Sequence, residues 1–335
     1  MEGRGKILVI VAAVVFVAGT VVASPDPETF SIDGPPSLQD QADLLNPGMS
    51  VQVPKANLGL GPNDQLDALS AGVDAVHESN IVYFSVDRAS IGLAGPLSPL
   101  DVSGQAALNQ QAGDVFVTTN AQGVGSNPMG INSLHTNQNF FGLIPVVGSL
   151  QDNTANPQDN LDALCLEEFD LSPLQPDGVQ DRDVYFSLGA NSPSLGVNSA
   201  ADILQSPAGG VSFGVFATAG QMGLLPEDDL DALALLDLDG VVTPGLDLAL
   251  FSLAPGSPTL LGPDGVFGTA DDLSAADLFL TTFNNFSCVR HVAGSLGLLA
   301  EDNVDALDVQ IPEPASMCLF SVGGVLLALC RRRKT

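Results

Sequence analysis

Short runs of β-forming residues separated by turns recur in a fixed order along most of the chain. A Phe-Ser pair lies within the apolar runs at 83–86, 185–188 and 250–253. Each run is followed by an apolar stretch led by Asp, at 114–117, 202–204 and 277–280, and then by an extended segment, at 134–136, 215–218 and 289–292. Runs of this length bounded by Gly, Pro, Asn or Asp are typical of strands joined by turns.

A motif Asp-x-[Leu/Val]-Asp-Ala-Leu precedes each of these three Phe-Ser runs, and a fourth copy ends the repeat region. It occurs four times, at 64–69, 159–164, 228–233 and 302–307, and a Gly-Leu pair stands shortly before each copy. Self-similarity at long, regular intervals is typical of repeat architectures. We therefore predict that each repeat supplies four strands, of which the motif is the first.

The two ends of the repeat region complement each other. Segments at 30–32, 42–45 and 51–53 match the second, third and fourth strands of a repeat that lacks its first, whereas 302–309 is a first strand with nothing after it. A ring closed by both ends leaves no unpaired sheet edge at its junction. The sequence predicts an all-β fold, a four-bladed β-propeller closed by N- and C-terminal strands. The alternative, a β-solenoid or another repeat β fold, calls for capping repeats instead.

The second aspartate of each motif is the first candidate site. If the motif strands line the axis, these carboxylates form a ring, and we call them the ring aspartates: Asp67, Asp162, Asp231 and Asp305. Strict strand alternation places Asp67 on the face opposite Leu66 and Ala68. Clustered carboxylates are relieved by protonation, by backbone N–H donors or by a hard cation such as Ca²⁺. The competing interpretation is that the repeated aspartates only accept hydrogen bonds from turn backbone.

A second candidate is the acidic segment 262–272, which occurs in one repeat. Asp264 and Asp271 stand near its ends, in an arrangement that resembles short calcium loops without matching the EF-hand spacing. Asp237-x-Asp239-Gly240 carries a fragment of the same pattern without the terminal Glu. Acidic surface turns are the alternative for both segments.

The two ends of the chain look like targeting segments. Residues 1–23 combine Arg4 and Lys6 with an apolar run and a small-residue exit, which predicts a secretory signal peptide; an N-terminal anchor is the alternative. Residues 312–335 combine an apolar run that predicts a short transmembrane helix with a motif and a basic cluster: Pro312, Glu313, Pro314, then Arg331, Arg332 and Arg333. The repeat domain is then 24–311.

The tail resembles the PEP-CTERM sorting signal of Gram-negative bacteria. This resemblance covers only 312–335, and it implies an export machinery and an exosortase-type processing enzyme as partners. It also implies an inner-membrane anchor with the body outside the cytoplasm, followed by release to the cell surface or the extracellular space. Carriers of the signal are often linked to exopolysaccharide.

Composition and the lack of familiar motifs argue against several classes of function. The 335 residues carry a formal net charge of −29, which argues against a nucleic-acid partner, and 45% hydrophobic residues are enough for a core. The three histidines occupy non-equivalent positions, and no familiar catalytic motif is found. Cys165 and Cys288 leave open either one disulfide or two thiols. We predict a non-catalytic interaction platform of the envelope or extracellular matrix, which contacts exopolysaccharide or envelope proteins. The alternative is a secreted polysaccharide hydrolase or glycan-binding protein on the same scaffold.

Overall fold

The computed structural model describes most of the repeat region. The described residues are 27–33, 42–70, 81–95, 97–118, 131–143, 158–166, 183–208, 210–237 and 239–309. The predicted signal peptide, the predicted membrane helix and the sorting motif lie outside these residues. No helix in the described part of the chain has the length and apolar character needed to cross a bilayer.

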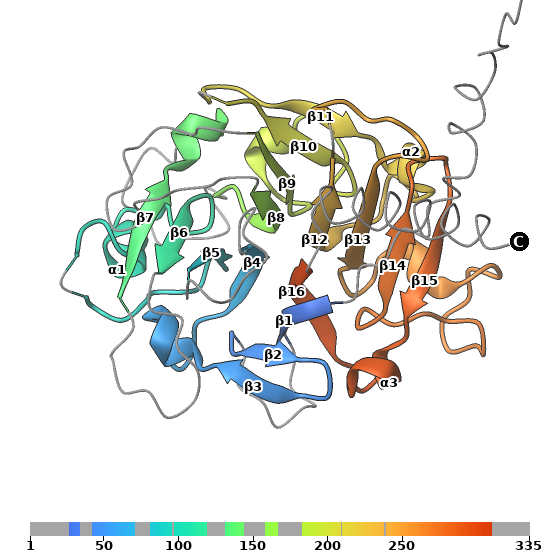
Figure 1. Cartoon of the computed structure of the whole chain (residues 1–335), viewed down its shortest axis with the longest axis horizontal. Coiled ribbons are helices and arrows are strands. Elements are labelled where there is room, and N and C mark those ends of the chain that lie inside the picture. Colours follow the sequence, from blue (N-terminus) through green and yellow to red (C-terminus); the bar gives the residue numbers. More distant parts are fainter. Residues whose placement is uncertain are drawn as a thin grey trace, which may run out of the picture. The chain divides into compact units, whose positions relative to one another are not determined.

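Four antiparallel sheets of four strands surround a common axis (Figure 1). Blade 1 contains β4 (Leu66–Ser70), β5 (Val82–Val86), β6 (Val115–Thr118) and β7 (Asn132–Thr136). Blade 2 contains β8 (Leu161–Leu166), β9 (Val184–Leu188), β10 (Ile203–Ser206) and β11 (Gly214–Ala217). Blade 3 contains β12 (Leu230–Leu236), β13 (Leu248–Leu253), β14 (Leu278–Thr281) and β15 (Ser287–His291).

Blade 4 is built from both ends of the repeat region, as the complementary segments predict. Its strand order is β16 (Asn303–Val309), β1 (Pro27–Asp33), β2 (Leu44–Asn46) and β3 (Ser50–Val53). β1 and β16 pair antiparallel from Pro27 opposite Val309 to Asp33 opposite Asn303. The all-β, four-bladed arrangement is therefore confirmed, and the open solenoid is excluded as the arrangement of these sheets.

Short helical turns occur at two kinds of connection. Three lie between the second and third strands of a blade: α1 (Val102–Ala106), η4 (Pro193–Leu195) and η5 (Pro258–Leu261). Four others connect the outer strand of a blade to the next blade: η1 (Lys55–Leu58), η3 (Gln138–Phe141), α2 (Ala219–Met222) and α3 (Ala293–Leu296). The glycine of each Gly-Leu pair caps one of them: Gly59, Gly142, Gly223 and Gly297 all have positive φ. Glycine recurs there because a left-handed residue ends the turn without a Cβ penalty.

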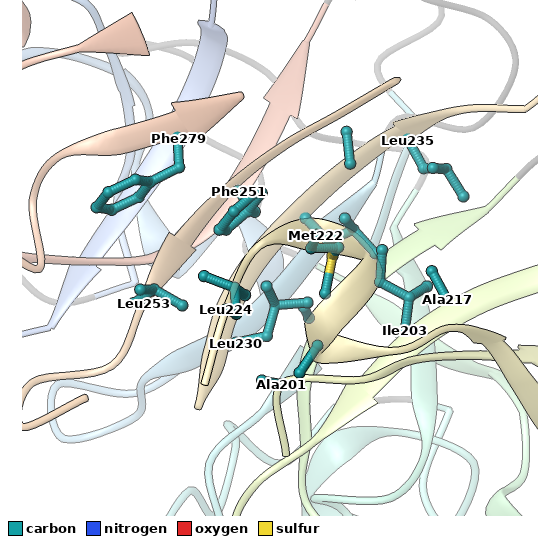
Figure 2. Close-up of a cluster of buried hydrophobic side chains, with 14 of the residues drawn as sticks. Ala201, Ile203, Ala217, Met222, Leu224, Leu230, Leu235, Phe251, Leu253 and Phe279 are labelled. Carbon is teal, nitrogen blue, oxygen red and sulfur yellow. The ribbon is translucent and has the colours of Figure 1, made fainter. Parts of the chain in front are cut away.

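The hydrophobic core lies between blades rather than within one sheet. Figure 2 shows the cluster shared by blades 2 and 3, which includes Phe251, Phe279 and Leu230 of blade 3 together with Met222 and Ile203. A second cluster joins blades 1 and 2, and a third joins blades 4 and 1. Both faces of the sheets in blades 1 and 2 are thus covered by neighbouring blades, which explains why their strands read as continuous apolar runs.

The motif strands occupy the innermost position in all four blades. β4, β8, β12 and β16 contact one another around the axis, and each stands first in its sheet (Figure 1). The predicted place of the Asp-x-[Leu/Val]-Asp-Ala-Leu strand is therefore where the structure puts it.

Candidate functional site

Each ring aspartate lies at a β-bulge of its inner strand. In blade 1 the ladder runs from Leu66 opposite Val86 directly to Ala68 opposite Ser85, so Asp67 is the extra residue. The same shift occurs at the ring aspartates of the other three blades. Strict alternation across Leu66, Asp67 and Ala68 is therefore wrong, because a bulge inserts one unpaired residue and re-aims its side chain.

The ring aspartates lie close enough for their charges to interact. Burial first, and then the charges of Asp162, Asp305 and Asp231 among others, raise the pKa of Asp67 well above its ordinary value. Burial also raises the pKa of Asp162 to about 8, and those of Asp231 and Asp305 well above the usual range. The arrangement is that of several carboxyl groups that cannot all ionise at little cost.

The other repeated aspartates do a different job. The first aspartate of each motif accepts backbone N–H groups: in blade 3, Asp228 takes them from Leu225 at 2.7 Å and Thr259 at 2.8 Å. Asp64, Asp159 and Asp302 accept comparable bonds from turn backbone. The aspartates before the third strands do so too, at Asp43, Asp114, Asp202 and Asp277. The turn interpretation therefore fits these two series.

Side chains at the variable position of the motif reach back to the preceding blade. Asn160 of blade 2 donates through Nδ2 to Asp67 Oδ2 of blade 1 at 2.6 Å, and also to Asp162. Asn303 of blade 4 donates through Nδ2 to Asp231 Oδ2 of blade 3 at 2.6 Å. Two of the four junctions between blades thus place an amide against a ring carboxylate.

At the other two junctions the variable position does not donate an amide N–H to a ring carboxylate. In blade 3 the variable position is Asp229, whose charge raises the pKa of Asp162; burial raises the pKa of Asp229 itself to about 6. The charge of Arg88 acts on both groups and lowers their pKa values. In blade 1 the equivalent Gln65 donates to Asp33 instead of a ring aspartate.

A smaller residue makes room for one ring carboxylate. Gly189 follows β9 at the position that Asp33, Asp87 and Ala254 occupy in the other blades. A Cβ atom at Gly189 would lie 2.5 Å from Asp162 Oδ2, which real contacts essentially never show. The close approach of this carboxylate therefore requires glycine.

The serine of the Phe-Ser pair joins blades near the axis. Ser85 donates to Leu161 O at 3.2 Å, Ser187 to Leu230 O at 2.8 Å and Ser252 to Val304 O at 2.6 Å, each time in the next blade. At the closing blade, Ser31 donates to Asp305 Oδ1 at 2.6 Å. Sequence reasoning used this serine only to define a strand, although its recurrence in register was a signal for a shared role.

Replacement of Ser252 by alanine is expected to lower the free energy of unfolding by about 1–3 kcal/mol, because it leaves the buried Val304 carbonyl without this donor. Chemical denaturation of the full chain measures the change. Ser295→Ala is the matched control, since Ser295 is exposed and donates within its own turn; its effect should stay within about 0.5 kcal/mol. Equal losses for the two variants would contradict a joining role for Ser252.

The acidic loops lie apart from the innermost strands. Asp264 and Asp271 belong to the connection between β13 and β14, where Asp264 accepts from Val266 N at 2.8 Å and Asp271 accepts from Thr269 Oγ1 at 2.8 Å. The Thr269 hydroxyl lowers the pKa of Asp271. Calcium binding by this loop stays a prediction.

A cluster of three carboxylates lies between β12 and β13. Asp237, Asp239 and Asp247 each offer an oxygen within 4.8 Å of the others, and within the described ranges this is the one acidic, His or Cys group of three that converges so closely. Backbone N–H groups already serve it: Gly240 N lies 2.9 Å from Asp237 Oδ2, and Thr243 N lies 2.6 Å from Asp247 Oδ2. The sequence supplied the first two members but not Asp247.

The thiols and histidines do not converge on one site. Cys165 on β8 and Cys288 on β15 lie in different blades and are not bridged, so the disulfide alternative is not formed. His135 on β7 packs on Tyr83 with ring centroids 4.8 Å apart, and His291 lies on β15 of another blade. His77 is outside the described residues.

Fold and axis together define a closed four-bladed β-propeller with an acidic centre. A family model described as the PEP-CTERM protein-sorting motif matches residues 310–334, so the chain carries this motif. The motif indicates an exported, membrane-sorted protein processed by exosortase-type machinery. No curated protein and no solved structure matches the chain.

Proposed function

We propose that this chain is an exported, non-catalytic interaction platform of the cell envelope or extracellular matrix. An N-terminal signal peptide starts its export, the tail holds the propeller outside the cytoplasm at the inner membrane, and processing at the sorting motif releases it to the cell surface or beyond. The sorting motif at 310–334 supports the route. Exopolysaccharide or other envelope proteins are the proposed partners.

One observation carries the non-catalytic part of the proposal: the repeated polar residues are engaged in holding the fold. Two of the three aspartate series accept backbone N–H groups, and the Phe-Ser serines join blades. The described histidines stand on outer strands of separate blades. A hydrolase needs an acid and a base on either side of one bond. Side chains that are hydrogen-bonded to turn backbone or to a neighbouring blade do not provide that pair.

The alternative is a polysaccharide hydrolase that works at the axis. Its support is the pair Asp162 and Asp229, whose pKa values are raised to about 8 and about 6. When two neighbouring carboxyl groups have different pKa values, the group with the higher pKa can act as the acid and the other as the base. Against it, Asp162 is only 8% exposed and is packed between blades.

Incubation of the full-length chain with a panel of neutral and acidic polysaccharides separates the two functions. The platform predicts retention of the chain on a polymer with no release of reducing ends. Turnover that disappears in Asp229→Asn but persists in Asp264→Asn, an exposed control, would establish the hydrolase. A chain that neither binds a polymer nor captures an envelope protein would rule out the platform.

A further inference from the structure

We propose that the propeller axis binds one hard divalent cation of the Ca²⁺ class, held by oxygen atoms of the ring aspartates and by the side-chain carbonyl of Asn303. The site is independent of the proposed partner. It rests on which oxygen atoms the fold leaves without donors around the axis.

Two buried acceptors at the closing blade have no hydrogen-bond donor. Asp305 is 4% exposed; Ser31 donates to its Oδ1, whereas its Oδ2 has no partner. Asn303 is 7% exposed, and its Nδ2 donates to Asp231, which fixes the amide orientation and leaves Oδ1 without a donor. Buried acceptors of this kind are unfavourable unless a donor or a cation meets them.

The neighbouring junctions add two more acceptors of the same type. Asn160 Oδ1 and Asp229 Oδ1 are also buried atoms without a hydrogen-bond partner. Three of the four oxygens belong to the variable position of the motif and one to the ring position, two residues further on. Buried acceptors without a partner therefore occur at the motifs of blades 2, 3 and 4.

The protein's own cations do not balance this excess. Arg88 is the basic residue whose charge acts on Asp162 and Asp229, and its Nη2 donates to Ser192 Oγ at 3.3 Å. Among the described residues, no basic group is a cause of the pKa shifts of Asp67, Asp231 and Asp305; burial and other carboxylates raise them. A bound cation would supply the missing positive charge.

The spacing of the ring limits how many of its carboxylates can bind one ion directly. Within the described ranges only the cluster Asp237, Asp239 and Asp247 brings three carboxylate oxygens within 4.8 Å of one another, so the ring does not. Ca²⁺ accepts six to eight oxygens in flexible geometry, including amide carbonyls and water, whereas Mg²⁺ demands a tight octahedron. Two ring carboxylates, Asn303 Oδ1 and water molecules would satisfy Ca²⁺.

The test is calcium titration of the full-length chain after chelation. Calorimetry is expected to give one Ca²⁺ per chain at the axis, with weaker Mg²⁺ binding, and thermal unfolding is expected to shift to a higher midpoint because the ion binds the folded state. Asp305→Asn is expected to weaken Ca²⁺ binding at least about tenfold. The same variant should be no less stable than the parent in chelator, because an amide at this buried position cannot ionise.

Asp239→Asn is the matched control, since Asp239 is the exposed member of the other acidic cluster. Loss of calcium binding in Asp239→Asn with retention in Asp305→Asn would place the ion between β12 and β13 and overturn the axial site. An unchanged unfolding midpoint and no calorimetric binding at millimolar Ca²⁺ would overturn it as well. If Asp305→Asn fails to fold, Asn303→Ala takes its place, because it keeps every carboxylate and removes one proposed ligand.

Discussion

Deletion of residues 303–309 is expected to unfold the whole propeller rather than fray one end. β16 is the innermost strand of blade 4, pairs with β1 and contacts the inner strands β4 and β12. Val304, Ala306 and Leu307 are at most 1% exposed, so their loss opens the core between blades. The lost free energy should exceed the roughly 5–15 kcal/mol that keeps a typical domain folded. Circular dichroism and denaturant titration of the full chain carrying the deletion measure the result.

The matched control removes seven residues from an exposed loop. Residues 263–269 lie in the connection between β13 and β14, mostly exposed, so their deletion should cost about 1 kcal/mol or less. A chain without residues 303–309 that still unfolds in one transition, at the same denaturant concentration as this control, would show that the closing strand is dispensable.

Acid is expected to stabilise the metal-free chain. The ring aspartates keep their protons in the folded state up to pKa values near 8 for Asp162, whereas the same carboxyl in the unfolded chain ionises near 3.8. Between these values the folded state binds more protons, so the free energy of unfolding falls as pH rises. One carboxyl can account for at most about 4 kcal/mol between pH 5 and pH 8, and we expect a total loss of at least about 2 kcal/mol.

The groups around the ring set the direction of this effect. Asp87 and Asp33 add negative charge and raise the pKa values further, while Arg88 opposes them at Asp162 and Asp229. Asp229, with a pKa of about 6, changes in the same sense. Asp271, whose pKa is lowered, acts in the opposite sense but only in stronger acid, outside this range.

Urea denaturation in chelator at pH 5, 6.5 and 8 measures the dependence. Asp162→Asn should make the dependence shallower and raise stability at pH 8, because the amide has no charge to bury. The other buried carboxyls with raised pKa values, Asp114 among them, keep part of the dependence. Asp264→Asn, an exposed control, should leave the slope unchanged. Stability that rises from pH 5 to pH 8 in the parent chain would mean that the ring is ionised and neutralised by protein groups alone.

Most of the fold could be predicted because the repeated segments can be recognised in the sequence. Their order also shows which strand of a repeat comes first and which strands the N-terminal segment lacks. The complementary segments at 30–53 and 302–309 predict ring closure, and β1 and β16 form that contact. A buried strand of such a repeat can be recognised from a short apolar run followed by turn residues, and both features are local in the sequence.

The geometry around the ring aspartates could not be predicted in the same way. A bulge at Asp67 depends on pairing with Val86 and Ser85, which alternation along one strand does not contain. The contact of Asn160 with Asp67 joins residues 93 apart in adjacent blades. Asp247 completes a cluster with Asp237 only because β12 and β13 form a hairpin. These features arise from packing between blades.

Pairing of β1 with β16 also dictates when the ring can close. Residues 27–33 are synthesised first among the described strands, yet their inner partner is not made until residue 309. During synthesis the first segment therefore waits unpaired on one side while the other blades become available, and this longest-range contact is expected to form late. The ring cannot be completed before residue 309 has been made, so β1 is the strand that stays longest without its inner neighbour.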